Sequence, residues 1–188
     1  MKHIIRSFTL FASIAMLAAC SSPDRTEELA TVDSLQSIAS NYADSMKMPI
    51  FDSVKVIAEE SKNKSDFLLD TYRDSTDREF WVENFGDYAR LHKKSDEYNE
   101  NLAELREAWE LSVTQLDDLK VDISNNAIDF ETAALYIQKE AEAIEVQKHE
   151  YRTMKGSAES FLSIYHRTKN VIEDRLQRLN GEQEESDI

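Results

Sequence analysis

The sequence predicts an all-α fold: a long antiparallel coiled-coil hairpin with two shorter helices packed at its base, which together form a partial four-helix bundle. The chain of 188 residues holds only 3 glycines and 2 prolines, so little interrupts its helices. Apolar residues also recur every seven residues along two long stretches, which is the pattern of a coiled-coil seam. This length is that of a single domain.

Two amphipathic segments come first. Between residues 29 and 46, apolar side chains recur at steps of three and four, as on one face of a helix. Pro49 ends this helix, because a proline disfavours the helical conformation of the preceding residue, Met48. Residues 50–72 predict a second helix from the same spacing, weakest at Ser61-Lys62-Asn63-Lys64.

Thr76 and Glu79 form a capping-box pattern, which predicts the start of a third helix. A fourth helix follows the turn-like Ser124-Asn125-Asn126 and is predicted to end at Gly181. The third helix repeats every seven residues at Trp81, Tyr88, Ser95, Leu102, Trp109, Leu116 and Ile123. The fourth repeats at Phe130, Ile137, Ile144, Tyr151, Ala158, Tyr165, Ile172 and Leu179.

These two repeats pair in one antiparallel register. If Ile123 meets Phe130, the same register brings Leu116 to Ile137 and continues through seven layers to Trp81 and Ile172. Only the layer of Ser95 and Ala158 consists of small residues. We expect local flexibility or a bound neighbour there.

The helix lengths predict the architecture. The third helix, at about 1.5 Å per residue, is on the order of 70 Å long, about twice the length of the first two. We expect the second helix to return along the base of the hairpin and the first to run parallel to the third. Cys20, Thr76 and Asn180 then lie at the base, and Asn125-Asn126 forms the far tip. Trp81, at the base, is expected to be more enclosed than Trp109.

The N-terminus has the pattern of an export signal. Lys2, His3 and Arg6 precede an apolar run from Phe8 to Met16, which is too short to span a bilayer. Leu17-Ala18-Ala19-Cys20 follows and contains the only cysteine of the chain. These residues resemble the lipobox of bacterial lipoproteins. An ordinary cleaved signal, in which Cys20 is incidental, is the alternative.

The resemblance implies cleavage before Cys20 and acylation of its sulfur, so that acyl chains hold the mature protein on a bacterial membrane. In that family, Ser21 after the cysteine favours the outer membrane, facing the periplasm. The expected organisation is a signal peptide at 1–19, a lipidated tether at 20–26, a helical domain at 27–180 and a disordered acidic tail at 181–188.

The chain is strongly acidic. Removal of residues 1–19, which contain Lys2 and Arg6 and no acid, leaves 20 basic and 37 acidic residues, a formal charge of −17. Such a charge repels phosphate backbones and anionic headgroups, which argues against nucleic acid as a partner. Cationic partners are favoured electrostatically, although an acidic surface also serves solubility alone.

The sequence shows no pattern of a catalytic, cofactor or metal site. His92, His149 and His166 are preceded at three residues by Ala89, Val146 and Ser163, so no Glu-x-x-His pair is present. Glu145 and His149 share a helix face, but one such pair is weak support for a metal. The chain also has no Gly-rich phosphate loop and no nucleophile elbow.

These observations favour a lipid-anchored, non-catalytic interaction or scaffold protein of the cell envelope. Its hairpin tip or its acidic face would engage an envelope protein, and its oligomeric state is left open. A periplasmic holdase-type chaperone is one alternative. An acidic inhibitor or immunity factor for a cationic envelope enzyme is another.

Overall fold

The structure, a computed structural model, describes residues 24–72 and 77–186. Every regular element in these residues is helical, which confirms the all-α class. None of the described helices combines the length and the hydrophobicity that a membrane span requires. The elements are α1 (Thr26–Ser45), α2 (Pro49–Thr71), the π-helix η1 (Glu79–Phe85), α3 (Gly86–Arg90), the 3₁₀ turn η2 (His92–Lys94), α4 (Ser95–Ser124) and α5 (Phe130–Ser186).

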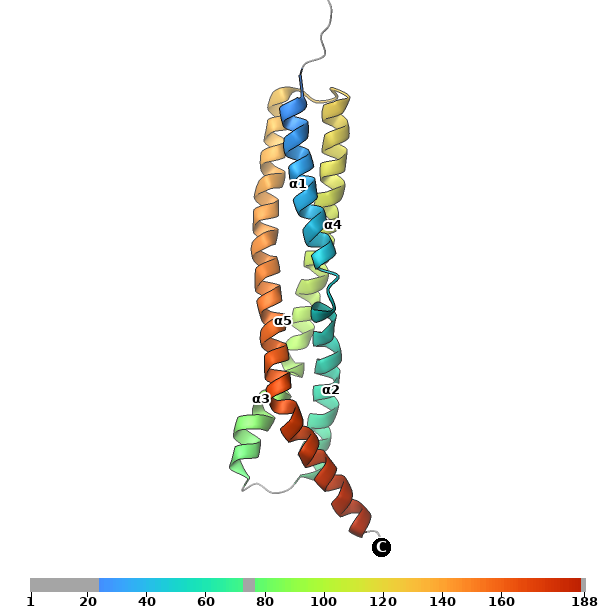
Figure 1. Cartoon of the computed structure of the whole chain (residues 1–188), viewed down its shortest axis with the longest axis vertical. Helices are drawn as coiled ribbons and strands as arrows, with labels where there is room; N and C mark the ends of the chain where they lie inside the picture. Colours follow the sequence, from blue (N-terminus) through green and yellow to red (C-terminus); the bar gives the residue numbers. More distant parts are fainter. Residues whose placement is uncertain (1–23, 73–76, 187–188) are drawn as a thin grey trace, which may run out of the picture.

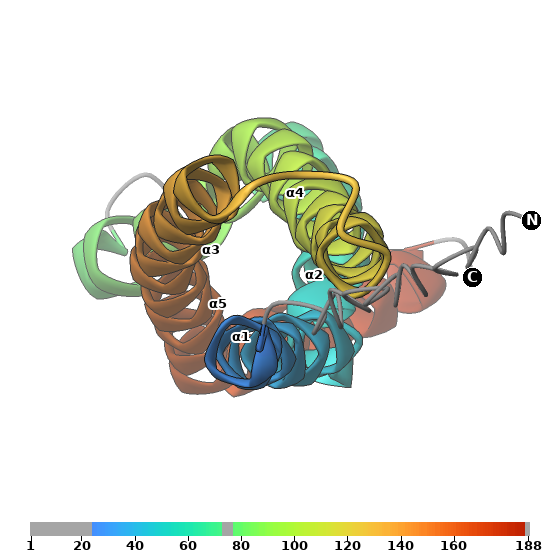
Figure 2. The same cartoon turned by 90° about the horizontal axis from the view of Figure 1, so that it is seen from above.

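The helices form three columns side by side (Figure 1). α1 and α2 lie end to end in the first column, and the segment from η1 to α4 forms the second. α5 alone forms the third column, and it continues past Gly181, where the sequence predicts its end. Seen from above, the three columns surround a common axis (Figure 2). The resulting molecule is an elongated rod (Figure 1).

α2 lies at the base, among η1, α3 and the later part of α5, but the predicted place of α1 beside it is wrong. Arg25 donates a hydrogen bond of 2.5 Å from Nη2 to the carbonyl of Ile128, and its guanidinium lies 4.2 Å from the ring centre of Phe130. α1 therefore begins beside the turn between α4 and α5 and runs antiparallel to α4 (Figure 1). The chain bends at Pro49 instead of reversing, so α1 packs on the part of the rod near the turn between α4 and α5, and α2 packs on the other part.

The junction at Pro49 is held by a side chain from α4. Arg106 donates hydrogen bonds from Nε and Nη2 to the carbonyl of Met46, at 3.2 and 2.8 Å, and pairs with Asp52 at 3.0 Å. Met48 is extended, and Pro49 occupies the first turn of α2, where a missing N–H costs no helical hydrogen bond. The predicted helix break at Pro49 is confirmed.

The second column is not the continuous helix that the sequence predicts. It is regular α-helix from Ser95 onward, but it turns as a π-helix in η1 and tightens to a 3₁₀ turn in η2. The carbonyl of Tyr88 accepts a hydrogen bond of 2.6 Å from the buried hydroxyl of Ser61, on α2, and one of 3.1 Å from the N–H of Leu91. This break lies directly before Ser95, the small residue of the predicted thin layer.

The start of this column is capped by Asp77. Its Oδ1 accepts a hydrogen bond of 3.1 Å from the N–H of Phe80, as an N-cap carboxylate does. Thr76, the residue predicted for this role, lies outside the described residues. Residues 61–64, predicted to be a weak stretch, are helical in α2.

Two apolar clusters form the core. One lies among α1, the start of α2, α4 and the first part of α5, and includes the fully buried Trp109. The other lies among α2, η1, α3 and the later part of α5, and includes the fully buried Tyr88. Most predicted seam residues are buried, but Phe130 is 49% exposed, because Ala133 takes the buried position at that end.

Candidate interaction surfaces

The predicted lipidation site, Cys20, lies outside the described residues. The structure does place the point at which the chain enters the fold. α1 begins next to the turn between α4 and α5, so residue 24 lies at the end that was predicted to be the far tip (Figure 1). The described chain therefore enters the helical domain at the predicted tip and not at the predicted base.

The outer surface of α4 is acidic. α4 carries nine Asp and Glu residues, all exposed, and only two cations, Arg106 and Lys120. Both cations reach the first column, where Arg106 pairs with Asp52 at 3.0 Å and Lys120 with Asp33 at 2.6 Å. At 100° per residue, five of the acids lie opposite the buried side of the helix. These five, called here the acidic face of α4, are Asp96, Glu100, Glu107, Glu110 and Asp118.

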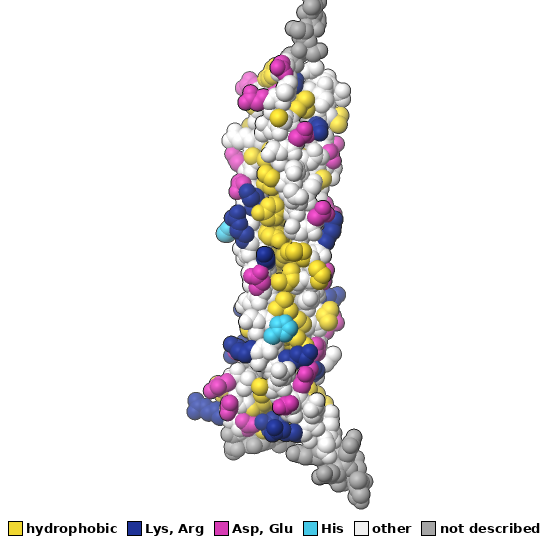
Figure 3. All heavy atoms as spheres, in the orientation of Figure 1, with side chains coloured by type: hydrophobic (Ala, Val, Ile, Leu, Met, Phe, Trp, Pro, Cys, Tyr) yellow, Lys and Arg dark blue, Asp and Glu magenta, His cyan; other side chains and the backbone are white. Residues whose placement is uncertain are grey.

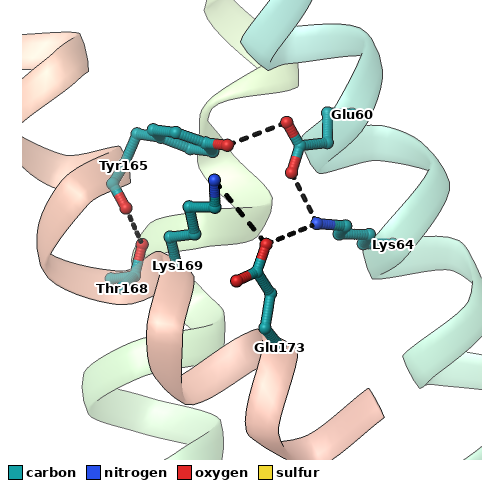
Figure 4. Close-up of polar contacts among 6 residues, drawn as sticks. All are labelled: Glu60, Lys64, Tyr165, Thr168, Lys169 and Glu173. Carbon is teal, nitrogen blue, oxygen red and sulfur yellow. Dashed lines mark hydrogen bonds and ion pairs between the residues drawn. The ribbon is translucent and has the colours of Figure 1, made fainter. Parts of the chain in front are cut away.

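A polar network joins α2 to α5 (Figure 4). Tyr165 donates a hydrogen bond of 2.8 Å to Glu60, whose other oxygen lies 2.5 Å from Lys64. Lys64 also pairs with Glu173 at 3.2 Å, and Glu173 lies 3.7 Å from Lys169. Every charge in this network has an opposite charge beside it, which is the arrangement of a structural ion-pair network.

The ionisation of this network follows from its contacts. Burial opposes the charge of Glu60, but the hydrogen bonds from Lys64 and Tyr165 outweigh it and hold the pKa of Glu60 below its usual value. Burial likewise opposes the charge of Lys64, and its hydrogen bonds to Glu60 and Glu173 raise the pKa of the ammonium. Both groups are therefore held in their charged forms, which leaves neither poised for proton transfer near neutral pH.

A groove of about 680 Å³ lies between the second column and α5, at the helix break. Its apolar lining comes from Leu91, Met154, Phe161 and Ile164. Gly156 also lines it, and a Cβ atom at this position would meet no atom within 4 Å. Tyr98 also lines the groove, and burial raises the pKa of its hydroxyl to about 12. The lining includes Lys94 and Ser157, the chain neighbours of Ser95 and Ala158, but neither of these two buried residues.

The groove also carries charge. Lys94 and Arg152 line it and form no ion pair with any described residue, whereas Arg90 pairs with Asp87 at 3.2 Å. Asp87 is shared with Arg167. With Glu97 included, the lining holds three cations and two anions, a formal charge of +1 in a chain of charge −15. The groove is thus a locally cationic site on an acidic protein.

Exposed apolar side chains form one continuous line on the surface, and others are exposed singly. A line of apolar side chains follows the junction of α5 with the column of α1 and α2, with charged side chains on both sides (Figure 3). Elsewhere, large apolar side chains such as Val56, Leu111 and Val146 are exposed far apart in the chain. Single exposed apolar residues of this kind are normal in proteins.

Within the described part of the chain, no three or more His, Cys, Asp and Glu side chains are arranged to hold a metal ion. Glu145, the predicted neighbour of His149, pairs with Lys148 at 2.6 Å. His149 lines a second hollow of about 610 Å³ beside the groove.

No known protein family, characterised protein or solved structure matches this chain. Its function is therefore argued from its own surfaces. The sequence indicated an acidic surface, and the exposed Asp and Glu residues of α4 correspond to it. It did not indicate the groove, because the cations that line it are 58 residues apart in the chain, at Lys94 and Arg152.

Proposed function

We propose that this chain is a lipid-anchored, non-catalytic interaction protein of the bacterial envelope, held by acyl chains on Cys20 at the outer membrane and facing the periplasm. It binds a basic envelope protein through the acidic face of α4. The observation that carries the proposal is the placement of charge on α4: both of its cations are paired with the first column, so the charged side chains on its outer surface are all acids.

The acidic face suits a protein partner better than a membrane. α4 has 30 residues, which gives it a length of about 45 Å. Carboxylates along this length repel anionic headgroups and attract cationic proteins, whose association they accelerate. An inhibitor of a cationic enzyme would use the same surface, and a loss of the captured enzyme's activity would identify that role. We also propose that α4 and α5 pack against each other as a coiled coil, with knobs-into-holes contacts between their side chains.

The anchor is tested at Cys20. The substitution Cys20→Ser removes the only sulfur that can be acylated, so the protein should leave the membrane fraction and carry no lipid by mass spectrometry. The unmodified chain and Ser21→Ala serve as controls that should stay membrane-bound. A Cys20→Ser protein that still carries lipid would disprove the anchor.

The acidic face is tested by neutralising three of its exposed carboxylates. The variant Glu100→Gln, Glu107→Gln, Asp118→Asn keeps side-chain size and removes three charges. The control is Glu59→Gln, Asp66→Asn, Glu131→Gln, which removes three exposed carboxylates from α2 and α5. Pull-down from detergent-solubilised envelope should yield one stoichiometric partner with the parent and the control.

The α4 variant should lose most of that partner, and 0.5 M salt should weaken capture by the parent, because exposed charges are screened at that ionic strength. Equal capture by both triple variants would show that the partner binds elsewhere. Undiminished capture at high salt would show that charge does not drive the association.

A further inference from the structure

We propose that the groove between the second column and α5 binds a long-chain carboxylate, that is, a fatty acid with a single acyl chain. The site goes beyond the proposed function, because the acidic face of α4 takes no part in it. Its volume of about 680 Å³ lies within the usual range of small-molecule sites, which combine an apolar lining with a few polar groups.

The apolar lining accounts for the acyl chain. Leu91 from the second column and Met154, Phe161 and Ile164 from α5 line the groove. Three of these lie at spacings of seven and three residues along one side of α5, so a linear chain can follow them. Between Met154 and Ile164, α5 rises about 15 Å. An extended hydrocarbon chain is a better match to this shape than a compact ligand.

The cations account for the carboxylate. Lys94 and Arg152 lack ion-pair partners among the described residues, and they lie on the two sides of the groove. The net charge of the lining, +1, matches the single negative charge of a carboxylate group. A phosphate monoester, with close to two negative charges, would exceed the single positive net charge of the lining.

The neighbouring hollow limits where the carboxylate group of the fatty acid can lie. It adjoins the groove at Asn101, Thr153 and Met154, and its charged lining consists of Glu104 and Glu150, with no Lys or Arg. These acids repel a carboxylate. The head is therefore confined to Lys94 and Arg152, and the chain lies along the apolar side of α5.

The test uses the chain from residue 21 onward and three probes with the same chain length: dodecanoate, dodecanol and lauroyl lysophosphatidylcholine. Calorimetric titration below the aggregation concentration of each probe should show dodecanoate bound at one site per chain. Dodecanol, which lacks the charge, should bind at least tenfold more weakly. Each added methylene should strengthen carboxylate binding by roughly two- to fourfold, as its burial requires.

Two variants separate the head from the chain. Gly156→Leu adds a large side chain to the lining, where a Cβ has open space, and should abolish binding of dodecanoate by obstructing the groove. Because leucine favours helix over glycine, the fold should not suffer. The double variant Lys94→Gln, Arg152→Gln should weaken dodecanoate at least tenfold and leave dodecanol unchanged. The control Lys55→Gln, Lys62→Gln removes two exposed lysines of α2 and should change neither affinity.

Three results would overturn the assignment. These are dodecanol binding as tightly as dodecanoate, tighter binding of the lysophospholipid than of dodecanoate, and undiminished binding by Gly156→Leu. Capture of an acidic amphipathic helix, with no affinity for dodecanoate, would also overturn it and assign the groove to a protein. The α4 variant should bind dodecanoate as the parent does, so this site and the acidic face can fail separately.

Discussion

Trp109 and Trp81 differ in burial, and the difference is opposite to the one that the sequence predicts. Trp109 is fully buried and stacks on Tyr42 with 4.8 Å between ring centres, whereas Trp81 is partly exposed among other aromatic rings. Trp109→Ala should lower the free energy of unfolding by about 3–5 kcal/mol, and Trp81→Ala by less. Urea denaturation measures both, and a larger loss for Trp81→Ala would contradict this core.

Glu60 makes stability depend on pH. Its pKa is lowered in the folded chain, so its contribution is present above its ordinary value of 4.5 and is lost as the pH falls through the lowered value. Glu60→Gln should cost about 1 kcal/mol at pH 7. The difference from the parent should shrink below pH 4.5.

The exposed Glu59→Gln provides the comparison for that variant, and it should change stability little at any pH. If the parent and Glu60→Gln lose stability in parallel on acidification, the network of Figure 4 does not hold the Glu60 carboxylate as described.

At this scale, periodicity predicts apolar contacts well and polar contacts poorly. The heptad pattern identified Leu102, Trp109 and Leu116 as core, and all three are buried. It could not identify Arg25, whose partners are the carbonyl of Ile128 and the ring of Phe130. Such partners are brought together by the arrangement of helices, which no local spacing encodes.

The contact between α2 and the helix break can be tested at Ser61. Its buried hydroxyl donates a hydrogen bond to the carbonyl of Tyr88. Ser61→Ala would remove this bond and leave the carbonyl with the longer hydrogen bond from the N–H of Leu91. The substitution should cost about 1–3 kcal/mol and speed amide exchange around Leu91. Ser53→Ala, which removes only a hydrogen bond to the carbonyl of Pro49, is the matched control and should cost less. Equal costs would contradict the contact.

The sequence predicted where α1, α2 and α5 begin to within a few residues, because proline, turn residues and apolar spacing mark helix ends locally. It missed the π-helix and the 3₁₀ turn before Ser95. The heptad pattern runs through both, since Tyr88 and Leu102 keep their spacing across the break. The departure from regular helix accompanies a hydrogen bond from α2, which is a tertiary contact.

The arrangement of the three columns predicts specific crosslinks in the unaltered chain. Lys120 lies 2.6 Å from Asp33, so a zero-length carbodiimide reagent should join α1 to α4 at these residues. Lys64 and Glu173, 3.2 Å apart, should join α2 to α5. Mass spectrometry of a proteolytic digest identifies both pairs. Crosslinks between α1 and residues near Trp81 would instead support the packing of α1 at the base that the sequence predicts, and would contradict the three-column arrangement.

At the scale of the whole molecule, the sequence left one choice undetermined. A bend and a reversal at Pro49 place the same apolar faces against the same hairpin, so both satisfy the periodicity of residues 29–72. The bend aligns Asp33 with Lys120 and Asp52 with Arg106. These pairings span more than 50 residues, and they distinguish the two arrangements only after the three columns are assembled.

The entry of the chain beside the turn between α4 and α5 also determines how the rod would bear a pull. Residue 24 and the end of α5 lie at opposite ends of the molecule (Figure 1). Tension between them acts along the helices, so α1 slides against α4 and α5 and many contacts carry the force together. Had both points lain at one end, the same tension would have peeled the helices apart one contact at a time. The helices are therefore loaded in shear, and the contacts of Arg25 with Ile128 and Phe130 are the first to bear the load.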